Sequence, residues 1–154
     1  MKIKEFDYNI YIDYSENLLG YLIIEKKNLK EILQRISRFK HYKNARNRKF
    51  YLKNVKKTIK EKDILEFIYK LKIRELRFTL EIYTDIAEFL GKHRRDLVFI
   101  SVDDSQYHTF KKLVRVIDGE NVSIKKESEL RRGTLEYQMS LLLDNILNIE
   151  RLKR

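Results

Sequence analysis

The sequence predicts an α/β domain in which helices flank a mixed β-sheet. Strand-like and helix-like segments alternate through the second half of the 154-residue chain, which is typical of a sheet covered by helices. Residues 97–102 form an apolar run broken only by Ser101, as expected for a central strand buried on both faces. No linker-like or repeated tract interrupts the chain, so we expect a single domain over residues 1–154.

The first expected elements are a β-hairpin and a helix. Tyr8, Ile10 and Ile12 alternate with their neighbours Asn9, Tyr11 and Asp13, and residues 19–25 form a second run rich in β-forming residues, which predicts a pair of strands. Asn17 and Gly20 flank the turn between them. Asn28 then caps a predicted helix whose apolar face has helical spacing and consists of Leu29, Ile32, Leu33 and Ile36.

The most unusual part of the sequence is the basic segment, residues 38–62. It contains eleven Lys or Arg residues and one acid, Glu61, so nearly all of the formal net charge of +11 arises there. Within it we expect residues 49–55 to form a short strand. Asp63 begins the next predicted amphipathic helix.

The second half has a more regular pattern. Residues 76–83 alternate apolar and polar side chains, which predicts a half-buried strand. A helix that Thr84 caps and Gly91 ends is expected to follow. After the central strand we expect a helix over residues 106–117, a turn at Asp118-Gly119, a strand over residues 121–126 and a last helix from about residue 134 to the basic C-terminus.

The composition limits the chemistry that the chain can perform. It has no Cys, which excludes disulfides, thiolate metal sites and thiol nucleophiles. His41, His93 and His108 are too scattered to match a zinc signature, and we expect them to be surface or packing residues. Carboxylates are therefore the expected ligands of any metal ion, and they favour Mg²⁺ or Mn²⁺.

The distribution of apolar residues bears on the location of the protein. No apolar run approaches the roughly 18 residues of a membrane span. The basic residues of the N-terminus are not followed by an apolar segment like that of a secretory signal. We therefore expect a soluble, cytoplasmic protein without a membrane partner, either as a monomer or as a homo-oligomer.

Acidic residues stand where predicted strands end and predicted helices begin. Asp13 ends the first strand, and Asp103 and Asp104 follow the central strand. Asp85 and Glu136 lie in the first turns of two predicted helices. Functional groups collect at such junctions in α/β sheets, so these acids are candidates for a site.

Two short strings resemble type 1 ribonuclease H. Asp104-Ser105-Gln106-Tyr107, after the central strand, looks like that family's central-strand motif, and Ile10-Tyr11-Ile12-Asp13-Tyr14-Ser15 is similar to the strand that carries its first catalytic aspartate. The resemblance implies a ribonuclease H-like mixed five-stranded sheet flanked by helices, and to this pattern the chain adds a basic helical insert at about residues 28–72. It also implies that acids from the first strand, a helix, the central strand and a late helix bind divalent metal ions.

Carried over by position, the resemblance assigns roles to particular acids. Asp13 becomes the first-strand carboxylate, and Asp104, rather than Asp103, becomes the central-strand carboxylate. Asp85 matches the helix acid, since the apolar residues that follow it have the family's spacing. Glu81 is the alternative, because its interval to the central-strand acid is near the family's usual one.

The fourth acid implied by the resemblance is either Glu136 or Asp144. Eight residues separate them on one predicted helix, a rise of about 12 Å, so the two cannot bind one ion. The chain also departs from the family pattern. It lacks a glycine-rich turn between the first two strands, it carries the insert, and its histidines do not sit where a mobile catalytic histidine is usual.

The expected function is a metal-dependent nuclease that hydrolyses phosphodiester bonds of single-stranded DNA or RNA, as an exonuclease or an endonuclease. Two Mg²⁺ or Mn²⁺ ions held by three or four carboxylates would activate water and neutralise charge. Lys and Arg of the basic segment would bind phosphates, and its aromatic residues, Phe50 among them, would stack on unpaired bases. The residues expected to contact nucleic acid are Arg38, Lys40, Tyr42, Lys43, Arg46, Arg48, Lys49 and Tyr51.

Two other functions remain open from the sequence. The first alternative is a nucleic-acid-binding module without catalysis, whose acids only cap turns. The second is a protein-interaction domain with incidental charge. Metal-dependent cleavage distinguishes the nuclease from both, and salt-sensitive nucleic-acid binding distinguishes the two alternatives from each other.

Overall fold

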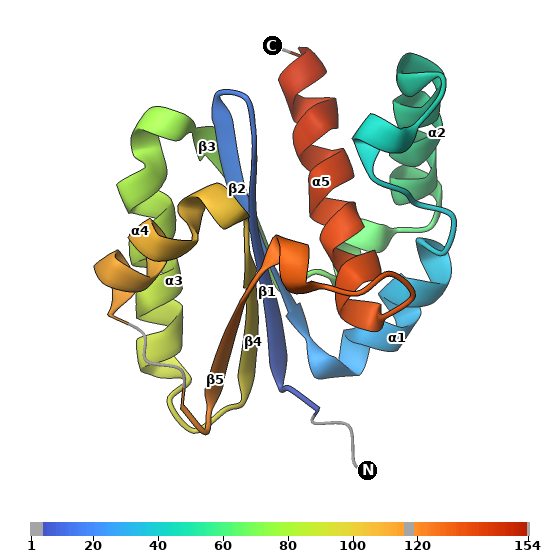
Figure 1. The fold of residues 1–154 in the computed structure, drawn as a ribbon. Coiled ribbons are helices and arrows are strands. Elements are labelled where there is room, and N and C mark those ends of the chain that lie inside the picture. Colours follow the sequence, from blue (N-terminus) through green and yellow to red (C-terminus); the bar gives the residue numbers. More distant parts are fainter. Residues whose placement is uncertain (1–4, 116–118, 154) are drawn as a thin grey trace.

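A mixed five-stranded β-sheet lies at the centre of the computed structural model, which describes residues 5–115 and 119–153 (Figure 1). The strands are β1 (Tyr8–Ser15), β2 (Leu18–Glu25), β3 (Lys70–Glu75), β4 (Val98–Val102) and β5 (Val122–Lys126). Their order in the sheet is β3-β2-β1-β4-β5. β2 pairs antiparallel with β1 and β3, whereas β4 pairs parallel with β1 and β5. The mixed sheet predicted from the sequence is confirmed.

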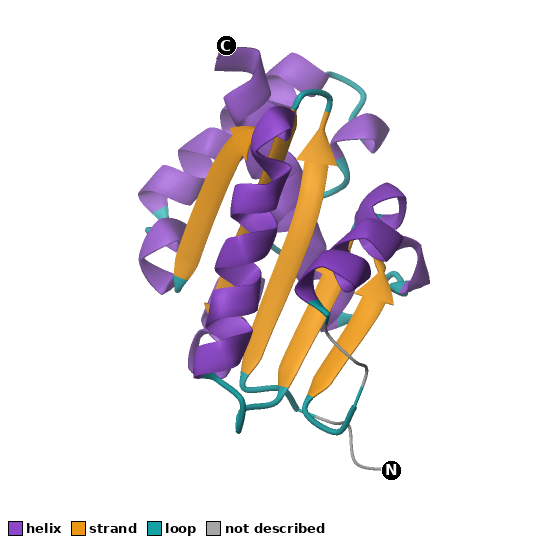
Figure 2. Ribbon diagram, turned by 90° about the vertical axis from the view of Figure 1, so that its left-hand side faces the viewer, coloured by secondary structure: helices purple, strands orange, loops and turns teal. Residues whose placement is uncertain are grey.

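Helices cover both faces of the sheet (Figure 1). One face carries α1 (Lys26–Arg35), α2 (Arg48–Glu61) and α5 (Leu135–Lys153). The other carries α3 (Thr79–Lys92) and α4 (Tyr107–Val114), and Figure 2 views the sheet from this side. α5 lies against β1 and β2, and α2 packs on the outer side of α5. No helix in the described part of the chain is both long and apolar enough to cross a bilayer.

Alternating side chains along β1 divide the core into two layers. Tyr11 belongs to the layer under α1 and α5, together with Phe99 of β4. Ile10 and Ile12 belong to the layer under α3 and α4. Burial of each such side chain contributes about 1.5–3 kcal/mol. Because helices cover both faces, β4 is buried at every position, which explains the continuous apolar run of the sequence.

Residues 76–83 do not form the predicted strand. They form a 3-10 turn, η3 (Leu76–Phe78), and the beginning of α3, while β3 precedes them in the chain. Ile82 and Ile86 bury one face of α3, whereas Leu80 is 63% exposed. The prediction was wrong because a short alternating run also fits the first turns of an amphipathic helix.

Residues 49–55 also differ from the prediction, since they belong to α2 instead of a strand. Asn47 caps this helix, and its side-chain oxygen accepts a hydrogen bond from the backbone N–H of Phe50 at 3.2 Å. The buried face of α2 has helical spacing and consists of Leu52, Val55 and Ile59. Of the predicted turn at Asp118-Gly119, Asp118 lies outside the described residues.

Gly20 of β2 is a point of close packing. A Cβ atom there would lie 3.0 Å from the backbone oxygen of Lys72 and 3.1 Å from a methyl group of Leu147. We expect Gly20→Ala to lower the free energy of unfolding by about 1–3 kcal/mol, because the neighbouring strand's carbonyl cannot withdraw easily. A Cβ atom on Gly91 of α3 would have nothing within 4 Å of it, so Gly91→Ala should raise stability by about 0.5–1 kcal/mol. Urea denaturation checks both variants, and equal effects of the two would contradict this description of the packing.

Candidate active site

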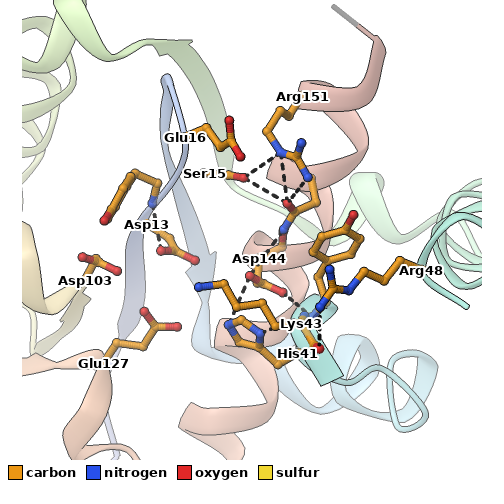
Figure 3. A pocket seen from close by; sticks show the side chains of 13 residues that line it. Asp13, Ser15, Glu16, His41, Lys43, Arg48, Asp103, Glu127, Asp144 and Arg151 are labelled. Carbon is orange, nitrogen blue, oxygen red and sulfur yellow. Dashed lines mark hydrogen bonds and ion pairs between the residues drawn. The ribbon is translucent and has the colours of Figure 1, made fainter. Parts of the chain in front are cut away.

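The carboxyl ends of β1, β4 and β5 meet at one edge of the sheet. In the parallel register Ile12 lies opposite Val102, and Val102 lies opposite Lys126. Each of these residues is followed directly by an acid, and the three acids form the acid cluster, Asp13, Asp103 and Glu127. One carboxylate oxygen of each lies within 4.8 Å of the others (Figure 3). The strand register itself therefore brings together acids that are far apart in the sequence.

Tight turns at the strand ends orient these carboxylates. Asp13 Oδ1 accepts a hydrogen bond from the backbone N–H of Tyr14 at 2.8 Å. Asp103 Oδ1 accepts from the backbone N–H and the hydroxyl of Ser105 at 2.9 and 2.6 Å, and so caps the 3-10 turn η4 (Asp104–Gln106). Glu127 begins a second 3-10 turn, η5 (Glu127–Glu129). The acid cluster is thus built into the ends of the strands.

Burial and repulsion between neighbouring acids disfavour the charged forms of two members of the acid cluster, Asp13 and Glu127. Burial raises the pKa of Asp13 well above its usual value, and the carboxylates of Glu127 and Asp144 add to this shift. Burial also raises the pKa of Glu127 to about 7, with further contributions from Asp103 and Asp144. A divalent cation between the carboxylates would relieve both effects. The hard oxygen donors fit Mg²⁺ or Mn²⁺.

Asp144 of α5 lies between the acid cluster and the 3-10 turn η1 (Tyr42–Asn44) (Figure 3). Its Oδ2 accepts a hydrogen bond from the backbone N–H of Tyr42 at 2.8 Å, and its Oδ1 lies 3.4 Å from Nε2 of His41. Burial raises the pKa of Asp144, although the hydrogen bond from Tyr42 and the charge of His41 oppose the shift. Asp144 is therefore a fourth acid near the cluster, and it also ties η1 to α5.

These acids line a pocket of about 560 Å³ that has walls of opposite charge. The acid cluster forms one side, and Asp144 lies in the middle (Figure 3). The basic side chains on the other side are His41, Lys43, Arg48 and Arg151. The pocket can therefore bind a divalent cation at one wall and an anionic group at the other.

Of the acids predicted from the sequence, Asp13 and Asp144 lie in this pocket, and Asp104 does not. Asp104 is exposed, and its Oδ1 accepts a hydrogen bond from the backbone N–H of Ser128 at 3.0 Å. Hydrogen bonds from the side chain and from the backbone of Ser128 lower the pKa of Asp104, and the charge of Lys126 acts in the same direction. At the end of β4 the structure places Asp103, rather than Asp104, beside the other acids, because Asp103 is the residue in register with Asp13.

Asp85 and Glu136 also lie away from the pocket. Asp85 belongs to α3 on the opposite face of the sheet, where it accepts hydrogen bonds from the Tyr21 hydroxyl and the Lys72 ammonium, each at 2.8 Å. Although burial acts to raise the pKa of Asp85, these two hydrogen bonds lower it overall. Glu81 pairs with the same ammonium at 2.8 Å. Glu136 lines a separate pocket at the first turn of α5. The structure therefore brings none of these three acids to the acid cluster.

The sequence analysis did not identify Glu127, His41 or Arg151 of the pocket as functional candidates. Glu127 directly follows the last strand, so the rule that picked out acids at strand ends also applies to it once β5 is placed parallel to β4. His41, expected to be a surface or packing residue, lines the pocket and contacts Asp144. The path of the chain through residues 28–72 brings His41 to Asp144. No local sequence motif predicts this contact.

The residues predicted to contact nucleic acid divide into three groups. Tyr42, Lys43 and Arg48 line the pocket. The hydroxyl of Tyr51 accepts from the backbone N–H of Lys40 and donates to the carbonyl of the same residue, both at 2.8 Å, so this tyrosine holds the insert together. The remaining basic side chains are exposed outside the pocket and belong to Arg38, Lys40, Arg46 and Lys49.

Comparison with solved structures identifies known proteins whose architecture is similar to that of this chain. Ribonuclease H2 from Pyrococcus horikoshii OT3 has a TM-score of 0.51 at 12% sequence identity, over 95% of this chain and 72% of that chain. The chain has the ribonuclease H-like fold. A mutant form of Bst-RNase HIII has a TM-score of 0.52 at 9% identity, over 96% of this chain and 53% of that chain. No family model and no curated protein matches the sequence. The ribonuclease H-like fold expected from the two short strings is thus confirmed.

Proposed function

We propose that this chain is a divalent-metal-dependent nuclease that hydrolyses phosphodiester bonds of nucleic acid. The observation that carries the proposal is the acid cluster, whose three carboxylates offer ligand oxygens within 4.8 Å of one another. Hydrolysis of a phosphodiester requires an activated water and neutralisation of charge on the reacting oxygens. The similar solved structures are ribonucleases H by name, which supports the same chemistry.

Asp13, Asp103 and Glu127 would hold the metal ion, and Asp144 is the fourth carboxylate of the pocket. A divalent ion bound there supplies Lewis-acid activation of water and charge neutralisation. The hydrogen bonds from Tyr14 and Ser105 keep two of the carboxylates aimed at one another before any ligand arrives. Because this geometry is set by the fold, little reorganisation is needed during the reaction.

The substrate proposed here is a single strand of RNA or DNA. Phe50 at the start of α2 is 60% exposed, and its neighbours Lys49 and Arg48 are basic and exposed. An exposed aromatic ring among cationic side chains is the arrangement that binds unpaired bases and their phosphates. The bases of a duplex are already stacked on each other and would gain less from this ring.

Cleavage of labelled oligonucleotides tests the proposal. The wild-type protein should cleave single-stranded RNA or DNA with Mg²⁺ or Mn²⁺ and should cleave nothing in EDTA. Asp144→Asn should reduce the rate by about 10–100-fold, because Asp144 lies in the pocket and orients its wall. Glu136→Gln, on the same helix outside the pocket, should leave the rate within about twofold of wild type.

The outcomes separate the proposal from its rival. Equal losses in the two variants would mean that the pocket is not the site of cleavage. Salt-sensitive binding of the oligonucleotide without cleavage under either metal would identify a nucleic-acid-binding module and would overturn the nuclease. An RNA–DNA hybrid duplex serves as the third substrate. Faster cleavage of this duplex than of either single strand would overturn the substrate assignment.

A further inference from the structure

The wall opposite the acid cluster contains two arginines that share one aromatic ring. The guanidinium carbon of Arg48 lies 5.4 Å from the centre of the Tyr42 ring, and that of Arg151 lies 5.7 Å from it. Arg48 belongs to α2 and Arg151 to the last turns of α5, so residues from distant parts of the sequence meet at this point. Both guanidinium groups thus lie within cation–π distance of the same ring.

Neutral acceptors hold both guanidinium groups in place. Arg151 donates to the hydroxyl oxygen of Ser15 at 3.1 Å and to Oδ1 of Asn148 at 3.1 Å. Arg48 donates to the backbone oxygen of Lys43 at 3.2 Å. Within residues 5–115 and 119–153, no carboxylate forms an ion pair with either arginine. The two guanidinium groups therefore take part in no ion pair in the described part of the chain, although the carboxylates of Glu16 and Asp144 line the same pocket.

The backbone that carries Tyr42 is fixed to α5. Gln138 donates from Nε2 to the backbone oxygens of Ile36 and Phe39 at 2.6 and 3.1 Å. Asn145 donates to the backbone oxygen of Lys40 at 3.0 Å, and the Tyr42 N–H donates to Asp144, as described above. The cationic wall is therefore preorganised by the same helix that carries Asp144, and it does not depend on a loose surface loop.

We propose that Arg48 and Arg151 form a phosphate-binding subsite for the substrate strand, beside the acid cluster. An arginine fork presents paired N–H donors that match the oxygens of a phosphate. The two cations also offset the repulsion between the acids and the strand that must approach them. This inference rests on the proposed function for its substrate, although the binding that it predicts does not require cleavage. The phosphate is either an internal backbone phosphate or a terminal one.

Binding of a fluorescent single-stranded oligonucleotide, measured by anisotropy in EDTA over a range of salt concentrations, tests the subsite. Arg48→Ala and Arg151→Gln should each weaken binding by about tenfold and reduce the slope of log affinity against log salt by about 0.7. Gln at position 151 keeps a side chain able to donate to Ser15 and Asn148, so it isolates the charge. Arg95→Ala is the matched control, because Arg95 is exposed and precedes β4, at the opposite end of the sheet. It should leave the affinity and the slope almost unchanged.

The source of the phosphate is resolved by repeating the titration with oligonucleotides that carry or lack a terminal phosphate. An affinity gain from the terminal phosphate that disappears in Arg48→Ala and Arg151→Gln assigns the subsite to a strand end. Equal losses on both oligonucleotides assign it to the backbone. Affinity and salt slope like those of wild type in both folded variants would overturn the subsite, whatever the cleavage assay shows. If the wild-type protein does not cleave the oligonucleotide but both variants show the expected binding effects, the result contradicts the proposed nuclease activity and leaves the subsite in place.

Discussion

Asp103→Asn should reduce metal-dependent cleavage by at least about 100-fold, whereas Asp104→Asn should leave the rate within a few-fold of wild type. Asp103 contributes an oxygen to the acid cluster, and loss of its charge removes a ligand from the proposed metal site. Asp104 instead accepts a hydrogen bond from the backbone of Ser128, and the side-chain oxygen of Asn can accept the same bond. Single-turnover cleavage rates at saturating Mn²⁺ measure both effects.

The two substitutions are a matched pair, since they make the same chemical change at adjacent positions. Both variants should retain oligonucleotide binding, because neither substitution removes a cationic side chain from the pocket wall that carries Arg48 and Arg151. Their far-ultraviolet circular dichroism and thermal transitions control for unfolding. A large loss in Asp104→Asn with a small loss in Asp103→Asn would show that the strand end turns the other way, and it would contradict the described geometry.

Glu127→Gln should make the metal-free protein more stable at pH 8 by about 2–3 kcal/mol and should leave its stability almost unchanged at pH 4. In the unfolded chain this carboxyl ionises near its ordinary pKa of 4.5, whereas burial and the neighbouring acids raise its pKa in the folded protein to about 7. Ionisation above pH 4.5 therefore favours the unfolded state increasingly until the pH passes about 7. Gln removes this cost, since it carries no charge. Urea denaturation in EDTA at both pH values measures the difference.

Binding of a divalent metal ion should reverse the loss of stability that the ionised Glu127 carboxylate causes at pH 8. At pH 8, Mn²⁺ should raise the melting temperature of the wild type by several degrees more than that of Glu127→Gln, because binding to the folded state adds stability. Glu129→Gln is the control. Glu129 is exposed, and its Oε1 accepts from the backbone N–H of Lys126 at 3.0 Å, a bond that Gln can keep. An equal effect of Glu127→Gln on stability at pH 4 and at pH 8 would show that Glu127 is not crowded by other acids.

The sequence was sufficient to predict the fold class, because its strongest patterns coincide with strands of the central sheet. The run at residues 97–102 is apolar apart from Ser101, and a strand covered on both faces accounts for such a run. The hairpin of β1 and β2 was also predicted correctly from the sequence. The third strand was misplaced because β3 alternates Lys and Arg with apolar residues at an exposed edge, while the neighbouring α3 begins with a run that happens to alternate.

Only part of the candidate site could be predicted from the sequence, because its assembly depends on the register of the parallel strands and on the path of the chain through residues 28–72. Asp13 follows from its place at the end of a buried strand. The choice between Asp103 and Asp104 is decided by which residue aligns with Asp13 across two parallel strands, and a single sequence does not contain that alignment. Asp85 had suitable local spacing, but α3 carries it to the other face of the sheet, where Lys72 and Tyr21 bind it.

The most direct test of the central claim is the position of Mn²⁺ in crystals soaked with that ion, located by its anomalous scattering. The claim is that Asp13, Asp103 and Glu127 form one divalent-metal site. It predicts an anomalous peak bound by oxygens of these three residues, and the same peak should be absent in crystals of Asp103→Asn. An ion bound by Asp104 or Glu136 instead, or a soaked crystal with no ion among the three carboxylates, would contradict the claim.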